Sequence, residues 1–256
     1  MAGLFEPDAL RVYRGRDFQI YPKLYLRQPT LDEIEGGETS DAEGSEKRFF
    51  HLIHTLMATP TDLMAQLDKQ GIRFEDISNY QLFMMLFPQM EQKTTRFLFG
   101  DELNPQNFKP TPVANQPGRV VLSSQQDEIT IDEVAYGAIV NYIGKMMNMK
   151  QTPFIKSGNE FTRMVRMEVA YEEMELAKNK TEESTLLNLI STMTNMEGFK
   201  YGWHDVWQMK IGAFMDAVRR VQTIVPAKAL LNGCYCGNID VSKIDKKQLN
   251  YFKNTV

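Results

Sequence analysis

The amino-acid sequence predicts an α+β, mainly α, protein in which amphipathic helices form two halves around a small antiparallel β insert. Three observations favour this fold class. Apolar residues recur at helical spacing through most of the chain, β-prone runs separated by prolines interrupt the helices in the middle, and a short β-prone unit precedes the first helix. The chain has 256 residues, of which 43% are hydrophobic, and is long enough to bury an adequate core.

Four segments follow from this pattern, and they could also pack as one continuous domain. They are an N-terminal β unit (1–30), a helical block (31–94), an antiparallel β insert (95–131) and a C-terminal helical bundle (132–256). Within the first segment, residues 10–13 and 18–26 are β-prone and flank a turn at Gly15. Pro22 is expected to interrupt pairing of the second run, because proline lacks the backbone donor of a sheet ladder.

The helical block opens with a predicted capping box, with Thr30 as the N-cap and Glu33 three residues later. From residue 31 to residue 46 the chain has seven acidic residues and no basic one. A run of this kind does not bury readily, so residues 32–46 are expected to form a solvated, mobile loop. An acidic docking segment is the alternative interpretation.

Three more helices are predicted in this block. Residues 46–58 form an amphipathic helix that stops before a proline. Thr61 or Asp62 caps the next helix, which ends at Gly71. The third helix opens with a second capping box and carries an apolar stripe. Its residues are Ser78 and Gln81 in the box and Leu82, Phe83, Leu86 and Phe87 on the stripe.

The middle of the chain changes from helical to β-prone character. Four prolines lie in this stretch, and three short runs rich in β-branched or aromatic residues lie between or beside them, at 96–99, 120–122 and 128–131. The polar residues 123–127 are expected to form the turn between the last two runs. The sequence therefore predicts a small antiparallel sheet that separates the two helical halves.

Helical spacing resumes after the insert. Asp132 is expected to cap a helix that runs to about Met149, and Thr181 a helix that ends near Gly198. Between them, residues 159–178 form a helix with Met164, Met167, Tyr171 and Met174 at 3, 4, 3 spacing. The longest stripe predicts a helix that starts near Gly202, before a turn at 233–237 and a final helix at 246–252. Its members are Trp203, Trp207, Ile211, Phe214, Val218 and Val221.

Composition and charge exclude several classes of protein. The formal net charge of −4 argues against a nucleic-acid binder, which would normally carry a basic face. No window of about 18 apolar residues occurs, so no membrane helix is expected, and the first residues show no signal-peptide pattern. Cys234 and Cys236 are the only cysteines, which favours a reducing compartment such as a cytosol.

No motif predicts a catalytic, cofactor-binding or metal-binding residue. His51 and His54 could share a metal at i, i+3 spacing, but the pattern lacks the glutamate of a zinc-protease helix, so a partly buried helix face is favoured. Cys234 and Cys236 are interpreted as small buried thiols in a turn. His204 and the adjacent aspartate would point about 100° apart on a helix, so they are not expected to form a catalytic pair.

Several segments, taken in order, resemble proteins from the morphogenesis cluster of tailed bacteriophages that infect Gram-positive bacteria. Among these proteins the tail assembly chaperone family is the most similar. The segments are residues 26–34 (LRQPTLDEI), 58–68 (ATPTDLMAQLD) with Gly71-Ile72, 80–86 (YQLFMML), 97–101 (FLFGD), 189–193 (LISTM), 198–201 (GFKY), 209–218 (MKIGAFMDAV), 233–237 (GCYCG) and 245–251.

The resemblance implies a non-enzymatic helper that holds the tape-measure or tail-tube protein in the host cytoplasm. Its partners would be other phage tail proteins, with no nucleic acid and no membrane. The large aromatics on the helical stripes are the expected partner-binding residues, although such a stripe also describes a core. They are Phe83, Phe87, Trp203, Trp207 and Phe214.

Two alternatives stay open at this stage. The protein could be a structural virion subunit of the neck, tail or baseplate, in which the β insert makes lattice contacts. The sixteen methionines could fill the core or form an adaptable binding surface, because the thioether side chain is flexible.

Overall fold

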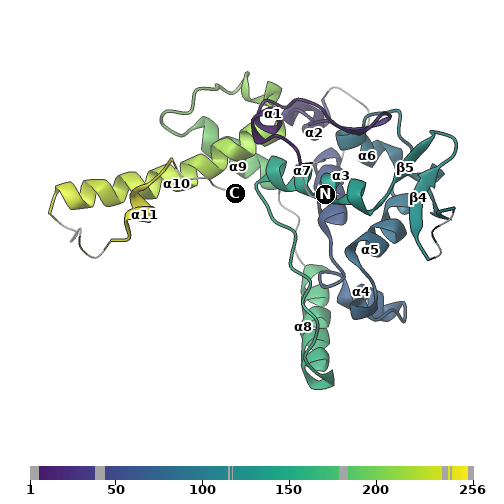
Figure 1. The fold of residues 1–256 in the computed structure, drawn as a ribbon. Coiled ribbons are helices and arrows are strands. Elements are labelled where there is room, and N and C mark those ends of the chain that lie inside the picture. Colours follow the sequence, from purple (N-terminus) through teal and green to yellow (C-terminus); the bar gives the residue numbers. More distant parts are fainter. Residues whose placement is uncertain are drawn as a thin grey trace.

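The computed structural model describes residues 6–37, 44–114, 116, 118–178, 184–237, 242 and 244–252. It is mainly helical, with 57% helix and 11 α-helices over the described residues, and has two small antiparallel sheets, which confirms the predicted fold class (Figure 1). The strands are β1 (Phe18–Tyr21), β2 (Leu24–Leu26), β3 (Lys109–Pro112), β4 (Val120–Ser124) and β5 (Ile129–Ile131). The helices are α1 (Ala9–Tyr13), α2 (Leu31–Glu35), α3 (Ser45–Met57), α4 (Met64–Lys69), α5 (Asn79–Leu86), α6 (Gln92–Phe99), α7 (Glu133–Met147), α8 (Glu160–Lys178), α9 (Thr185–Thr194), α10 (Ile211–Tyr235) and α11 (Lys246–Leu249).

The N-terminal unit is a short helix followed by a hairpin. The predicted strand at residues 10–13 is wrong: these residues belong to α1, because Asp8 caps it by accepting from the backbone N–H of Arg11 at 2.9 Å. The predicted turn at Gly15 is present, with a left-handed φ of +66°. Strands β1 and β2 then pair with each other, and Pro22 lies in the turn between them, where no ladder donor is needed.

Capping motifs locate the helix starts well in the first half of the chain. The boxes of Thr30 with Glu33 and of Ser78 with Gln81 are both confirmed at α2 and α5. Helix α3 is confirmed as well. Of the loop predicted at 32–46, residues 32–35 instead belong to α2 and residues 45–46 to α3, and residues 38–43 lie outside the described residues.

The predicted cap of α4 is wrong. The carboxylate of Asp62 accepts from the backbone N–H and hydroxyl of Thr59, at 2.8 Å each, so it closes the preceding turn instead. Leu63 occupies the N-cap position of α4 and provides no side-chain cap. The end of this helix near Gly71, with a φ of +73°, is as predicted.

The predicted strand at residues 96–99 is also wrong, because these residues end α6. Phe97 and Phe99 are both buried, and their rings contact Phe49 of α3 and Phe87 at centroid distances of 5.7 Å and 5.6 Å. An aromatic run favours a strand only on a half-buried, pleated surface, and here tertiary packing on both sides of a helix overrides that preference.

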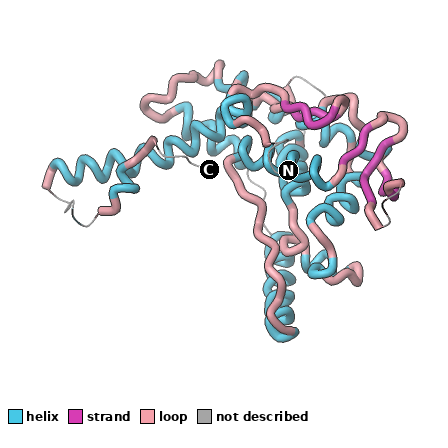
Figure 2. Tube along the Cα trace, viewed as in Figure 1, coloured by secondary structure: helices cyan, strands magenta, loops and turns pink. Residues whose placement is uncertain are grey.

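The β insert is a three-stranded antiparallel sheet of order β3-β4-β5. The two later strands and their polar turn are confirmed, whereas β3 is not predicted because it contains Pro110 and Pro112. Both prolines are tolerated because β3 is an edge strand. Figure 2 shows this sheet at the opposite end of the molecule from α10 and α11.

Helix α7 lies in the centre of the core. As predicted, Asp132 caps it, by accepting from the N–H of Ala135 at 2.9 Å. Its buried side chains face α1, α3, α10 and both sheets. The main hydrophobic cluster extends from Val12 to Val218 and includes residues from each of the four predicted segments.

Helices α8 and α10 extend from this body in different directions (Figure 1). Helix α8 packs on α4 through a second, smaller cluster that includes Leu67, Phe74 and Met167. Helix α9 is capped by Ser184, whose hydroxyl accepts from the N–H of Leu187, so the predicted cap is displaced by three residues. Thr181, the residue predicted as the cap, lies outside the described residues.

Helix α10 begins at Ile211, so the predicted start near Gly202 is wrong. Residues 206–208 form a 3-10 turn, and Lys210 is extended because it pairs with Thr30 as an isolated β-bridge. At its other end α10 continues to Tyr235, into the region predicted as a turn. The final helix α11 is shorter than predicted.

A set of contacts, here called the Gln28 junction, joins residues 28–31 to residues 209–212. The N–H of Leu31 donates to the carbonyl of Met209 and that of Ile211 to the carbonyl of Pro29, both at 3.0 Å. The buried Gln28 side chain donates to the carbonyl of Val12 at 2.7 Å and accepts from the N–H of Gly212 at 3.2 Å. No charge is buried, and both ends of the amide have partners.

We predict that Gly212→Ala destabilises the fold through this junction. A Cβ at Gly212 would lie 2.5 Å from Oε1 of Gln28, which leaves no room for a methyl group. The free energy of unfolding should fall by about 1–3 kcal/mol, measured by urea denaturation. Gly137→Ala in α7 is the control, because no atom lies within 4 Å of its Cβ position, and it should be neutral or stabilising by up to about 1 kcal/mol.

A second prediction concerns alkaline pH. Burial raises the pKa of Tyr142 in α7 to about 12, so the folded state holds the phenol proton more tightly than the unfolded chain. This contribution to stability, about 3 kcal/mol, is fully present below pH 10 and is lost as pH rises towards 12. Tyr142→Phe should flatten the loss of stability in this range, whereas Tyr235→Phe, at an exposed residue, should not.

Candidate functional site

Three of the five aromatic residues expected to bind a partner lie in the core. Phe83, Phe87 and Phe214 are at most 3% exposed, and the rings of Phe83 and Phe87 contact each other at a centroid distance of 5.0 Å. These side chains are therefore not available to a partner in this conformation. Of the five predicted residues, only Trp203 and Trp207 are accessible to a partner.

Trp203 and Trp207 lie together in a groove, which we call the tryptophan groove. Trp203 is 53% exposed and Trp207 is half-buried, and their rings are perpendicular at a centroid distance of 5.3 Å. The groove has a volume of about 660 Å³. Its lining comes from α2, the start of α3, α9 and the segment before α10.

One side of the tryptophan groove is apolar. Leu186 and Ile190 of α9 are buried in its floor, and Leu187 is 57% exposed beside them. An exposed leucine next to an exposed tryptophan leaves apolar surface in contact with water, which is characteristic of interaction sites when the residues are contiguous.

The groove also has an acidic part. Asp32 and Glu35 of α2 and Glu46 of α3 line it, and Lys47 is the one cationic side chain among its described lining residues. Glu46 accepts from the hydroxyl of Ser184 at 2.7 Å and from the N–H of Leu186 at 2.9 Å, so it fixes the start of α9. Within the described part of the chain, none of the three carboxylates forms an ion pair with Lys or Arg.

Part of this arrangement could be expected from the sequence. Residues 32–46 stand out as acidic, and an acidic docking segment is one interpretation of them. No periodicity, however, indicates that α9 and Trp207 lie against the same segment. That proximity is created by the Gln28 junction, which joins residues distant in sequence.

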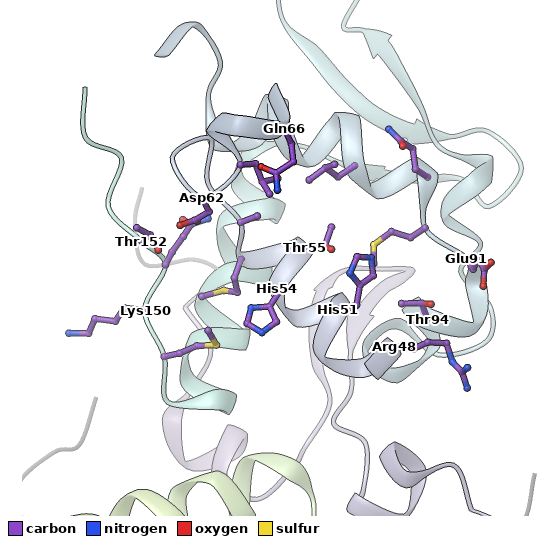
Figure 3. A pocket seen from close by; sticks show the side chains of 18 of the residues that line it. Arg48, His51, His54, Thr55, Asp62, Gln66, Glu91, Thr94, Lys150 and Thr152 are labelled. Carbon is purple, nitrogen blue, oxygen red and sulfur yellow. The ribbon is translucent and has the colours of Figure 1, made fainter. Parts of the chain in front are cut away.

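A larger groove of about 1210 Å³ lies between α3, α4, α6 and the segment after α7 (Figure 3). His51 and His54 line it from α3, Asp62 and Gln66 from the α4 side, and Lys150 from the segment after α7. Both histidines are exposed, which differs from the partly buried face expected. Neither imidazole is hydrogen-bonded to a carboxylate in the described structure, so the groove contains no assembled acid–base pair.

The remaining candidates from the sequence are separate surface residues. Cys236 is exposed and Cys234 half-buried at the end of α10, so the expectation of buried thiols in a turn is wrong. His204 and Asp205 are exposed, and no hydrogen bond links their side chains. Among the described residues, no group of three or more His, Cys, Asp or Glu side chains is placed to hold a metal ion.

A second apolar surface, here called the α8 face, consists of the exposed apolar side chains of α8. Met167 is buried against the body and Tyr171 packs beside it, so this side of the helix is covered by other residues. Five other apolar residues of the helix are 43% to 72% exposed, and by helical spacing Val165, Val169 and Leu176 lie opposite Met167. The five are Phe161, Met164, Val165, Val169 and Leu176.

Comparison with known proteins gives no assignment. No protein-family model matches the chain, and neither a curated protein nor a solved structure shows significant similarity to it. Over the described residues, no helix combines the length and apolar character needed to cross a membrane.

The accessibility of the two indoles can be measured directly, because they are the only tryptophans in the chain. We expect acrylamide to quench Trp203, observed alone in Trp207→Phe, more steeply than Trp207, observed alone in Trp203→Phe. The reason is that Trp203 is more than half exposed, whereas Trp207 packs against the core. Equal quenching, or the reverse order, would contradict this geometry.

Proposed function

We propose that this chain is a non-enzymatic bacteriophage tail morphogenesis protein that acts as a tail assembly chaperone. In this role it binds the tape-measure or tail-tube protein in the host cytoplasm before or during assembly. The observation that carries the proposal is the α8 face, which presents five exposed apolar side chains on one projecting helix. The sequence resemblance supplies the biological setting.

The chemistry of the α8 face suits a holding function. Exposed apolar side chains on a helix bind apolar segments of a partner and keep them from associating with each other. Met164 is 64% exposed, and an unbranched thioether adapts to partners of different shape. This role requires no catalytic residues.

A structural virion subunit of the neck, tail or baseplate is the second candidate. The three-stranded sheet at one end of the molecule is the feature that favours it, since an outer sheet can form lattice contacts (Figure 2). Its edge strand β3, however, contains Pro110 and Pro112, which oppose the addition of a further strand. The chaperone role is therefore the better supported of the two.

Mass spectrometry of purified mature virions, beside the infected-cell lysate, separates the two candidates. A chaperone should be present in the lysate and absent from the particle. Presence in the particle at a fixed stoichiometry would overturn the chaperone role and identify a structural subunit.

The α8 face itself can be tested by co-purification of tail proteins from infected cells, with each captured protein identified by mass spectrometry. The double variant Val165→Asp/Leu176→Asp should lose at least about tenfold of the captured tail protein, because buried apolar anchors dominate such interfaces. Leu10→Asp in α1, at a residue that is 69% exposed, is the matched control and should retain capture. Equal capture by both variants would exclude the α8 face as the binding surface.

A further inference from the structure

We propose that the tryptophan groove binds a short segment of the partner protein that carries apolar side chains next to lysine or arginine. The identity of the partner rests on the proposed function. The apolar and basic character of the bound segment is inferred from the groove itself. It is a separate surface from the α8 face, because it is built by α2, α3, α9 and the segment before α10.

The apolar floor of the groove indicates that the segment carries apolar side chains. Leu187 and Trp203 are each more than half exposed, and Trp207 and the buried Ile190 extend the same surface inward. The volume of about 660 Å³ lies within the range of about 300–1,000 Å³ that is usual for ligand sites. A few side chains of a linear segment fit this space, whereas a whole domain surface does not.

The carboxylates at the rim of the groove indicate that the segment carries basic residues. Asp32, Glu35 and Glu46 bring three carboxylates to one groove, and within the described residues no lysine or arginine forms an ion pair with any of them. Carboxylates in this arrangement attract a cation and repel phosphates, so a nucleic acid or an anionic membrane does not fit. A lysine or arginine side chain can also lie over an indole face, which is the preferred aromatic partner of a cation.

The geometry orients the segment as well. The acids Asp32 and Glu35 come from α2 and the leucines from α9, and the two indoles complete the lining. An amphipathic segment, with its apolar face towards α9 and its basic residues towards α2, satisfies both sides together. A purely apolar segment would leave the carboxylates unpaired, and a purely basic one would leave the apolar floor exposed to water.

Both tryptophans of the chain line this groove, so the intrinsic fluorescence of the full-length protein reports its occupancy. We would titrate the protein with three synthetic peptides of equal length. The first is an amphipathic Leu/Lys peptide, the second has Glu in place of each Lys, and the third has Ser in place of each Leu. The first should give a saturable spectral change, and the other two should bind at least about tenfold more weakly.

The double variant Asp32→Lys/Glu35→Lys should lose the basic peptide by at least about tenfold and gain affinity for the acidic one. Asp101→Lys/Glu102→Lys makes the same change of charge outside the groove and should leave the titration unchanged. Leu187→Ser, at an exposed residue, provides a second variant that should weaken binding even if the charge reversal disturbs the fold. Circular dichroism verifies that each variant is folded.

Three results would overturn the proposal: equal binding of the acidic and basic peptides, no fluorescence change with any peptide, or an unchanged titration in the groove variants. A fluorescence change that follows protein concentration alone would show a second copy of the chain as the occupant, and would also overturn it. The assay uses purified protein, so its outcome is independent of tail-protein capture. Capture that persists in the groove variants, with peptide binding lost, would locate the tail protein elsewhere and refute this inference alone.

Discussion

The Gln28 junction is the constraint on which the rest of the structure depends. Lys210 donates from its side chain to the carbonyl of Gln28 across 182 residues of sequence, at 2.9 Å. Two backbone hydrogen bonds and an isolated β-bridge accompany this contact. Closing so long a loop costs conformational entropy before any contact forms, so the junction needs several mutually supporting hydrogen bonds. Together they fix where α10 begins and which way α2 leaves the hairpin.

The same junction assembles the tryptophan groove. Glu33 completes the capping box at Thr30 and also interacts with Arg27 and Lys210. Burial alone would raise the pKa of Glu33. The pKa is nevertheless lowered, because Arg27 and the N–H of Thr30 donate hydrogen bonds to the carboxylate and because Arg27 and Lys210 are positively charged. The ionised carboxylate therefore favours the position of α2 next to residues 206–210. As a result, acids from residues 32–35 and indoles from residues 203–207 line one groove.

Helix starts were predictable from the sequence where the signal is local. Thr30, Ser78 and Asp132 each cap a helix through a side chain that bonds to a backbone N–H within three residues, so the spacing contains the whole interaction. The failures share another cause. The helix ending at Phe99 and the late start at Ile211 depend on aromatic packing and on a β-bridge to Thr30, neither of which periodicity encodes.

The candidate site shows the same limit. A helical stripe at Phe83, Phe87 and Phe214 has the same pattern whether it faces a core or a partner, and these three residues are buried. Trp203 and Trp207 differ from these three residues because they precede α10, which begins only after the extended Lys210. The stripe is thereby broken, and Trp203 is left at the surface beside the acids of α2. The tryptophan groove lies at the point where the helical prediction fails, because residues outside a regular element do not have to pack into its core.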